Sequence, residues 1–374
     1  MLIGDGPAVA MPGTGLAGEP STGPAISPAP VLVGQLFSDA AILSLFRPFE
    51  DARGILLAVS GGPDSVALML IAAKWASLLA APPPISVATV DHRLRESASR
   101  EAEMAASWAT SLSLPHAILV WEGVKPKSKI QERAREARYE LLFQHAARIG
   151  ANCVMTAHHA DDQAETILFR LLRGSGISGL AGMERESERN GLVLTRPLLG
   201  YAKMDLVALC AAKAHRFIED PSNHDPCYAR TGIRRVRGLL ASEGFDRAAL
   251  LRLGNRAARA EAALAARARA IREQLSARRE PGRFVADVSA LKDEPEEILL
   301  RILAGELKLL GNGKPLRLER LEVLVERFAQ ALRAGIGYKA TLSGAALRLK
   351  TNHTLVIVKE GARRSGYKNP HCLS

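Results

Sequence analysis

The sequence predicts an α/β protein with a doubly wound, mostly parallel sheet, followed by a helical domain and a small α+β C-terminal region. Two observations support this prediction. Short apolar segments rich in β-branched residues alternate with longer amphipathic segments as far as residue 215. Beyond residue 230 the composition changes to alanine, arginine and leucine, and it changes again near Pro281. Such alternation is typical of right-handed βαβ units, whose parallel sheet is covered by helices on both faces.

Strand and helix pairs make up the first half of the prediction. In each pair a short apolar run is followed by a segment with a hydrophobic period of about 3.6 residues. The pairs are 55–59 with 65–79, 85–90 with 97–111, 116–121 with 129–149, and 152–156 with 161–172. One helix over 36–49 precedes them, and a strand at 193–198 and a helix at 203–215 follow.

The C-terminal region has a different pattern. Two amphipathic helices, 296–310 and 318–332, precede two short strands, 345–349 and 354–358, around a turn at Asn352 and His353. The predicted domains are a disordered leader over 1–34, an α/β domain over 35–225, an arginine-rich helical domain over 226–280, an α+β domain over 281–360 and a loose basic tail over 361–374.

The charge predicts a polyanionic partner. Hydrophobic residues make up 47% of the chain and charged residues 24%, which is ordinary for a globular protein, but the net charge is +11. Nucleic acid and an anionic membrane surface both fit such a charge. Residues 230–280 contain thirteen arginines, no lysine and five acidic residues, so most of the excess lies in one helix-prone segment. A solvated helical face is the alternative interpretation of that segment.

Cysteine usage and the N-terminal segment predict a cytoplasmic protein. The four cysteines have no CxxC or metal-ligand spacing, which indicates a reducing compartment without structural zinc or an iron–sulfur cluster; they are Cys153, Cys210, Cys227 and Cys372. No lysine or arginine precedes Arg47, so residues 1–34 lack the basic region of a signal peptide. No unbroken apolar run is long enough to span a membrane, and we expect no membrane contact.

The most informative motif is the hexapeptide SGGPDS, which lies between a predicted strand and a predicted helix. Its residues are Ser60, Gly61, Gly62, Pro63, Asp64 and Ser65. Amides at a helix N-terminus and the positive end of the helix dipole favour a phosphate, and adjacent glycines let the backbone close around it. The serine hydroxyls add donors. The sequence therefore predicts a phosphate-binding loop, with a tight turn and a serine N-cap as the alternative.

The loop lacks the lysine of a Walker motif, which argues against ordinary transfer of a γ-phosphate. The carboxylate of Asp64 would repel a bare triphosphate, so its presence predicts a magnesium ion between the two.

Two further polar clusters follow predicted strands, at residues 91–93 and 158–162. The carboxyl ends of parallel strands meet at one edge of a sheet, so we expect these clusters to lie near the hexapeptide. Asp161, Asp162 and Glu165 can share one helical edge and hold a cation, either Mg²⁺ or a substrate ammonium; a capped helix start explains them equally well. His158 and His159 should point to opposite faces, so at least one is expected to be structural.

Two other motifs are interpreted as local structure. Residues 174–179 match the letters of a dinucleotide fingerprint, but they follow a helix and not a strand, so we interpret them as a mobile loop near the site. The segment EDPSN at 219–223 is a turn by composition and a candidate hinge.

Six segments together resemble the tRNA(Ile)-lysidine synthetase family. They are SGGPDS, DHRLR at 91–95, QERAREARYELL at 131–142, AHHADDQAETILFRLLRGSGISGLAGM at 157–183, RPLL at 196–199 and EDPSN at 219–223. The hexapeptide is shared by the whole N-type ATP pyrophosphatase superfamily, whereas the segment 157–183 is far more specific. The resemblance covers residues 50–240 closely and the rest loosely.

The resemblance implies a carbon–nitrogen ligase with an adenine nucleotide alpha hydrolase-like fold. Its substrate is the wobble cytidine, position 34, of the isoleucine tRNA with a CAU anticodon. ATP, with Mg²⁺, adenylates the C2 oxygen of this base and pyrophosphate is released. The ε-amine of free L-lysine then displaces AMP to give lysidine, which changes codon reading from AUG to AUA. A phosphate loop without the Walker lysine suits cleavage between the α- and β-phosphates.

The resemblance also implies roles for individual residues. ATP would contact residues 60–65, Asp91 and His92, and Asp64 would also hold Mg²⁺. Free lysine would bind Asp162 and Glu165, and the catalytic residues would be Asp64, Asp161, Asp162 and Glu165. The 35–225 domain would be the catalytic PP-loop domain, and the 226–280 domain would bind tRNA. The implied tRNA ligands are Arg95, Arg133, Arg230, Arg234, Arg235 and Arg237.

Some features differ from the family pattern, and other functions stay open. Residues 228–234 read YARTGIR where the family has Tyr-x-Arg-Asn-x-Ile-Arg. The region after residue 280 is shorter than in the longer members of the family. These differences leave open how the acceptor stem of the tRNA is recognised. A tRNA thiolase of the same superfamily and a non-catalytic, ATP-sensing RNA-binding module are the alternatives. The general base and the oligomeric state, with a homodimer among the alternatives, are not fixed by the sequence.

Overall fold

The computed structural model describes residues 30–360, apart from 95–96, 124, 127, 129, 190, 219–235, 237–238, 241, 243, 312 and 314–315. The chain forms two compact units. The first contains residues 1–161 and 185–223, and the second contains residues 162–184 and 224–374. The segment 162–184, which we predicted to lie inside the α/β domain, is therefore grouped with the C-terminal half.

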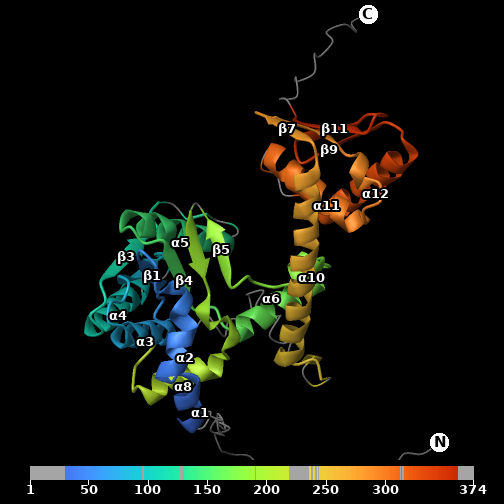
Figure 1. Cartoon of the computed structure of the whole chain (residues 1–374). Helices are drawn as coiled ribbons and strands as arrows, with labels where there is room; N and C mark the ends of the chain where they lie inside the picture. Colours follow the sequence, from blue (N-terminus) through green and yellow to red (C-terminus); the bar gives the residue numbers. More distant parts are fainter. Residues whose placement is uncertain are drawn as a thin grey trace, which may run out of the picture. The chain divides into compact units, whose positions relative to one another are not determined.

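The first unit contains a six-stranded sheet with the order β3-β2-β1-β4-β6-β5 (Figure 1). Its strands are β1 (Ile55–Ala58), β2 (Ile85–Asp91), β3 (His116–Val120), β4 (Cys153–Thr156), β5 (Glu186–Arg189) and β6 (Leu192–Thr195). All neighbours are parallel except β5, which is antiparallel to β6. The chain runs outward from β1 to β3 and then returns to place β4 on the other side of β1. The switch point of the sheet, where ligands bind in such folds, therefore lies between the carboxyl ends of β1 and β4.

Helices cover both faces of this sheet, which confirms the predicted fold class. The helices of this unit are α1 (Pro30–Leu36), α2 (Asp39–Phe46), α3 (Pro63–Leu78), α4 (Ser97–Ser111), α5 (Ile130–Arg148) and α8 (Lys203–Ala212). Because side chains alternate along a strand, Ile55 and Leu57 of β1 pack in a core with α2, α3 and α8, whereas Leu56 packs with Leu142 of α5 on the other face.

Two predicted elements of this unit have different limits. The helix predicted over 36–49 is broken, because Ser38 takes an extended conformation and its side chain accepts the N–H of Ala41 at 3.3 Å, which starts α2 as a new helix. The strand predicted over 193–198 ends at Thr195, because Pro197 opens a 3-10 turn over Pro197–Gly200.

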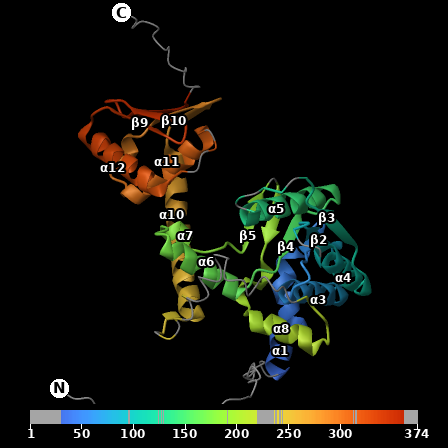
Figure 2. The ribbon, with the colours of Figure 1, turned by 180° about the vertical axis from the view of Figure 1, so that it is seen from behind.

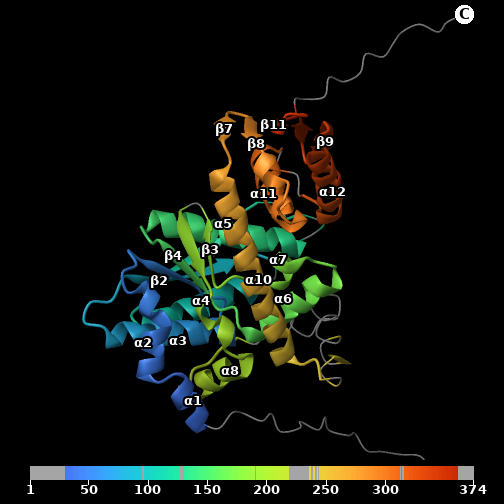
Figure 3. The same cartoon turned by 45° about the vertical axis from the view of Figure 1, so that its right-hand side comes forward.

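The second unit combines helices with a five-stranded antiparallel sheet, ordered β7-β8-β11-β10-β9 (Figure 3). The strands are β7 (Ala277–Glu280), β8 (Arg283–Asp287), β9 (Tyr338–Leu342), β10 (Ala345–Leu349) and β11 (Thr354–Lys359). The helices are α10 (Arg247–Gln274), α11 (Glu296–Leu310) and α12 (Leu318–Ala334), with α7 (Ile177–Leu180) and most of α6 (Ala160–Leu172). None of the described helices is long and apolar enough to cross a membrane.

The long helix α10 joins the parts of this unit. Asp246 caps its start by accepting the N–H of Ala249 at 2.8 Å. Near this end, Leu250 packs with Ile167 and Leu168 of α6, and α7 also contacts α10 (Figure 2). Ile271, at the other end, belongs to the core formed by α11, α12 and the antiparallel sheet. The helical region that we predicted as a separate domain thus packs at one end into the core of the α+β region, and both regions fall in one compact unit.

Candidate nucleotide-binding site

The hexapeptide forms a tight loop between β1 and α3. Gly62 is the N-cap of α3, and Pro63 occupies the first turn of the helix, where its missing N–H costs nothing. Gly61 has a φ of +88°, a conformation that favours glycine. A Cβ at this position would lie 2.4 Å from Cδ1 of Ile218, whose N–H donates to the Gly61 carbonyl at 2.9 Å. The first amides of α3 have no acceptor inside the helix and are available to an anion at the loop.

The two serines hold the loop closed. The Ser65 hydroxyl donates to the Gly62 carbonyl at 2.9 Å and accepts the N–H of Ser60 at 3.1 Å. The Ser60 hydroxyl is 3.3 Å from that of Ser65 and lies on an exposed residue. No side chain caps the start of α3, so the alternative of a serine N-cap is wrong. Ser65 shapes the loop, and Ser60 is the exposed serine of the pair.

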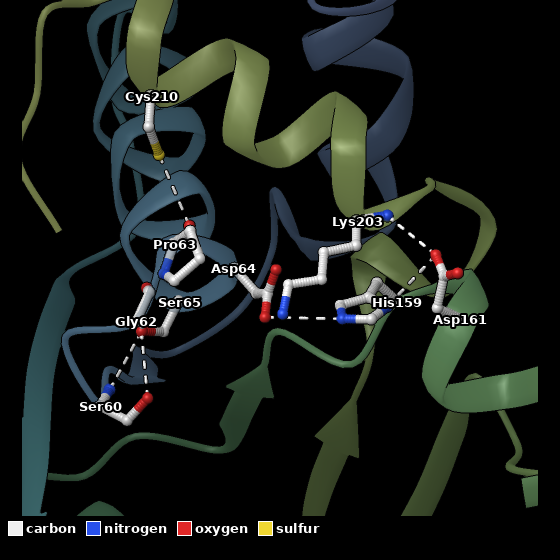
Figure 4. A network of polar contacts seen from close by, with 9 residues as sticks. All are labelled: Ser60, Gly62, Pro63, Asp64, Ser65, His159, Asp161, Lys203 and Cys210. Atoms are coloured by element: carbon white, nitrogen blue, oxygen red, sulfur yellow. Dashed lines mark hydrogen bonds and ion pairs between the residues drawn. The ribbon is translucent and has the colours of Figure 1, made fainter. Parts of the chain in front are cut away.

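Asp64, His159 and Asp161 form a cluster at this loop (Figure 4). The Nε2 atom of His159 is 3.5 Å from Oδ2 of Asp64, and its Nδ1 atom is 4.0 Å from Oδ2 of Asp161. The side chain of His159 is only 6% exposed, so the imidazole is held between the two carboxylates. Asp161 also accepts the backbone N–H of Lys203 at 3.0 Å. His159 is therefore the histidine that lies in the cluster, a position that the sequence left undecided between the two histidines.

The remaining oxygen of Asp64 fits a metal ion. Oδ1 of Asp64 is buried and has no hydrogen-bond partner among the described residues. A carboxylate oxygen in this state suits Mg²⁺, which commonly binds one or two carboxylates together with substrate phosphates. The part of the chain that the structure describes contains no group of three or more His, Cys, Asp and Glu side chains able to hold a metal by themselves. An ion held by Asp64 would therefore share its ligands with a bound nucleotide.

Asp91 holds the loop after β2. Its Oδ1 atom accepts the N–H of Arg93 and its Oδ2 atom accepts the hydroxyl of Ser99, both at 2.8 Å. The residue is buried, so these contacts explain it without a ligand. Its predicted contact with ATP stays a prediction.

His92 lies beside an aromatic ring. Its imidazole meets the Trp121 ring edge-on, with the centroids 5.8 Å apart. Burial, followed by the charge of Arg138, lowers the pKa of His92, so the ring is neutral at pH 7. The Nδ1 atom is buried and has no hydrogen-bond partner among the described residues. A neutral imidazole with such an atom can serve the predicted contact with a nucleotide.

The other predicted residues are distributed over α6, the short segment before it, α5 and segments outside the described residues. Asp162 and Glu165 lie in the first turns of α6 and are counted with the second unit; Glu165 is buried. His158 makes a separate contact, 2.9 Å from Nδ1 to the Thr156 hydroxyl, as expected for neighbours at a strand end. Arg133 is exposed on α5 and pairs with Glu136 at 3.1 Å. Five predicted tRNA ligands, Arg95, Arg230, Arg234, Arg235 and Arg237, lie outside the described residues, as does the EDPSN turn.

The glycine-rich segment after α6 is tied to that helix. Arg170 donates to the carbonyls of Gly179 and Gly182 at 2.9 and 2.6 Å, and the Gln163 side chain bonds both backbone groups of Met183. No strand precedes the segment, since α6 runs directly into it. The match to a dinucleotide fingerprint is therefore a false positive, as predicted.

The described cysteines are unsuited to sulfur transfer. Burial, together with the charge of Glu186, raises the pKa of Cys153 to about 12. Burial, together with the charge of Asp64, raises the pKa of Cys210 to about 12 as well. Both thiols are thus protonated and poorly nucleophilic at pH 7. Cys153 is also the first residue of β4, so it lies at the opposite edge of the sheet from the loop.

A phosphate loop without lysine, at the switch point of a parallel sheet and followed by an acidic helical turn, defines the class of PP-loop ATP pyrophosphatases. Residues 36–238 match the PP-loop domain family. The chain is 48% identical to the tRNA(Ile)-lysidine synthase of Methylobacterium nodulans, over 84% of this chain and 93% of the relative. It is 42% identical to the tRNA(Ile)-lysidine synthase of Bradyrhizobium diazoefficiens, over 86% of this chain and 94% of the relative. The chain belongs to the tRNA(Ile)-lysidine synthase family, as the sequence motifs predicted.

A solved structure supports the fold alone. The U34-tRNA thiolase NcsA of Methanococcus maripaludis aligns with a TM-score of 0.52 at 12% sequence identity, over 60% of this chain and 80% of that one.

Proposed function

We propose that the protein ligates free L-lysine to C2 of cytidine 34 in the CAU-anticodon tRNA(Ile), with ATP as the source of energy. The observation that carries this proposal is the Asp64, His159 and Asp161 cluster at a phosphate loop, in a chain that belongs to the tRNA(Ile)-lysidine synthase family. The reaction would take place in the cytoplasm, where the tRNA substrate is found.

In the first step, the O2 atom of cytidine bonds to the α-phosphorus of ATP. The bond between this phosphorus and the bridging oxygen breaks, and its electron pair leaves with pyrophosphate. The amides at the start of α3 and the Ser60 hydroxyl would orient the phosphates. Mg²⁺, for which Asp64 Oδ1 is the fitting ligand, supplies charge neutralisation when bound.

In the second step, the lysine amine bonds to C2, the bond from C2 to O2 breaks, and AMP leaves with that oxygen. The ammonium, with an ordinary pKa of about 10.4, must lose a proton before it attacks. We propose that Asp162 and Glu165 hold this ammonium. The burial of Glu165 supports this role, because a carboxylate shielded from water attracts an ammonium more strongly than an exposed one does.

The two buried, protonated cysteines argue against the thiolase alternative. The other alternative, a non-catalytic ATP sensor, is distinguished by experiment.

The test incubates the protein with ATP, labelled lysine and transcripts of tRNA(Ile) and elongator tRNA(Met), both with a CAU anticodon. We expect label in tRNA(Ile) and pyrophosphate released in equal amount. Equal labelling of both tRNAs would contradict the specificity, and ATP binding without pyrophosphate release would indicate a sensor.

An exposed arginine stripe on α10 supports RNA binding. Arg252, Arg256 and Arg259 are spaced four and three residues apart and therefore lie on one face of the helix. No ion pair joins them to a carboxylate among the described residues. By contrast, Arg267 and Arg272 on the same helix pair with the buried Glu294 and Glu306. Unpaired guanidinium groups in a row suit successive phosphates of an RNA backbone.

Replacing these three arginines with glutamine should weaken tRNA binding about tenfold or more. Each lost phosphate contact should also lower the slope of log affinity against log salt by about 0.7 to 0.9. Filter binding between low and moderate salt measures both. The control replaces Arg317, Arg320 and Arg327, three exposed arginines at and on α12, and removes the same charge. An equal loss in both variants would show that only net charge matters.

A further inference from the structure

Lys203 has a fixed backbone position at the cluster. It is the first residue of α8, and its N–H donates to Oδ2 of Asp161 at 3.0 Å. A second hydrogen bond, from the N–H of Ala160 to the carbonyl of Tyr201 at 2.8 Å, ties the same two segments. Asp205 accepts the N–H of Ala202 at 3.0 Å and so closes the first turn of α8. The start of this helix is thus bonded to the residues that hold His159.

The rest of α8 is packed against the helix that begins at the phosphate loop. Leu206 and Leu209 are buried in the same core as α3. The Cys210 thiol donates to the carbonyl of Pro63 at 3.5 Å, one residue before Asp64. Because α8 is bonded at its start and packed along its length, the position of Lys203 relative to the loop is set by the core and not by a surface contact.

The side chain of Lys203 extends toward the carboxylate of Asp64 (Figure 4). It is half-buried, and no described carboxylate lies within 4.0 Å of its ammonium; the ion-pair partner of Asp64 is His159. The neighbouring Oδ1 atom of Asp64 is buried without a partner. An ammonium and a carboxylate oxygen therefore lie at the loop, each without an ion-pair contact to the other.

The loop itself lacks a cation, because residues 60–65 contain no lysine or arginine. We propose that Lys203 supplies the missing charge from α8, by binding the β- and γ-phosphates of ATP and stabilising the pyrophosphate that leaves. A phosphate between Lys203 and a metal ion on Asp64 would satisfy both groups. The ammonium keeps its proton throughout and offsets the negative charge that grows on the bridging oxygen. This inference rests on the proposed function, since that function defines which phosphates leave.

The test compares the full-length protein with Lys203→Ala, Lys203→Met and Lys203→Arg. Lys213, exposed just beyond the C-terminal end of α8, gives the matched control Lys213→Ala. Affinities for Mg²⁺-ATP and for Mg²⁺-pyrophosphate are measured without tRNA, and pyrophosphate release is measured with it. We expect the Ala and Met variants to lose about 10- to 100-fold in both affinities and at least as much in rate, as for loss of a charged hydrogen-bond donor. Lys203→Arg should keep most of both affinities and of the rate. The melting temperature and the tRNA affinity should be unchanged in all three variants.

Unchanged affinities for ATP and pyrophosphate in both the Ala and Met variants would overturn the inference, and lysidine formation by the wild type would still stand. A loss of affinity that parallels a loss of melting temperature, without rescue by arginine, would also overturn it and indicate a structural role. If the wild type makes no lysidine, the proposed function fails, but the two affinities measured without tRNA still test Lys203.

Discussion

Replacing Asp64 with alanine should lower tRNA-dependent pyrophosphate release by about a thousandfold or more. The reason is the loss of the buried Oδ1 atom that fits Mg²⁺. Metal stabilisation of phosphate charge contributes several kcal/mol, and about 1.4 kcal/mol corresponds to a factor of ten in rate. Asp64→Asn keeps the size of the side chain and should be nearly as inactive, because an amide is a poor ligand for Mg²⁺.

The same variants should bind tRNA within a few-fold of the wild type, since the proposed role of Asp64 is to hold the metal ion and phosphates of ATP and not the RNA. Asp64→Ala also loses the contact between Oδ2 and His159, so stability is compared with Asp64→Asn, which keeps a side-chain oxygen for that imidazole and should have an unchanged melting temperature. The control is Asp39→Ala, which removes an exposed carboxylate from the same unit. Loss of tRNA binding with unchanged pyrophosphate release would contradict the role of Asp64.

Replacing Gly61 with alanine should abolish ATP binding and destabilise the first unit. A residue with a Cβ pays about 1–3 kcal/mol for a positive φ, and here the Cβ would also lie 2.4 Å from Ile218. Since the Ile218 N–H bonds the Gly61 carbonyl, the side chain cannot move away without disturbing the loop. Thermal unfolding and ATP titration measure the two effects.

Gly150 is the matched control for this experiment. It has a φ of +73° but open space around the missing side chain, so Gly150→Ala should cost only the backbone strain and leave ATP binding intact. The double variant Gly61→Ala with Ile218→Ala should recover the part of the stability that the contact costs. Equal behaviour of Gly61→Ala and Gly150→Ala would show that the close approach to Ile218 is unimportant.

Much of the fold could be predicted, because the residues that the apolar periodicity of the sequence selects are the residues that the structure buries. The helices 97–111 and 296–310 and the strand 345–349 have the predicted limits, since each presents one continuous apolar face to a core. Four strands were missed: β5, β7, β8 and β9. In β8 the burial does alternate, with Phe284 and Ala286 in the core, but the run is short and was not recognised. The other clear case is β5 and β7, which are exposed, polar edge strands whose formation depends on pairing with a neighbour. Their residues carry no alternation that local reasoning could detect.

The site was predictable where function lies in a local motif, and not where it depends on tertiary contacts. The loop at residues 60–65 and the carboxylate of Asp161 follow from strand ends in a parallel sheet. Lys203 was not predicted, because it meets Asp161 across 42 residues and no spacing rule connects the two. The nearest signal was the RPLL segment, which ends four residues earlier. Likewise, the sequence could not show that Arg93 and Ser99 already occupy both oxygens of Asp91.

The central claim is that ATP is cleaved between its α- and β-phosphates with cytidine 34 as the acceptor. The most direct test supplies ATP labelled at the α-phosphate and CAU-anticodon tRNA(Ile), and omits lysine. We predict that label enters the tRNA at position 34 with one pyrophosphate released for each label, and that added lysine then releases the label as AMP. Release of inorganic phosphate and ADP, with no label on the tRNA, would contradict the account.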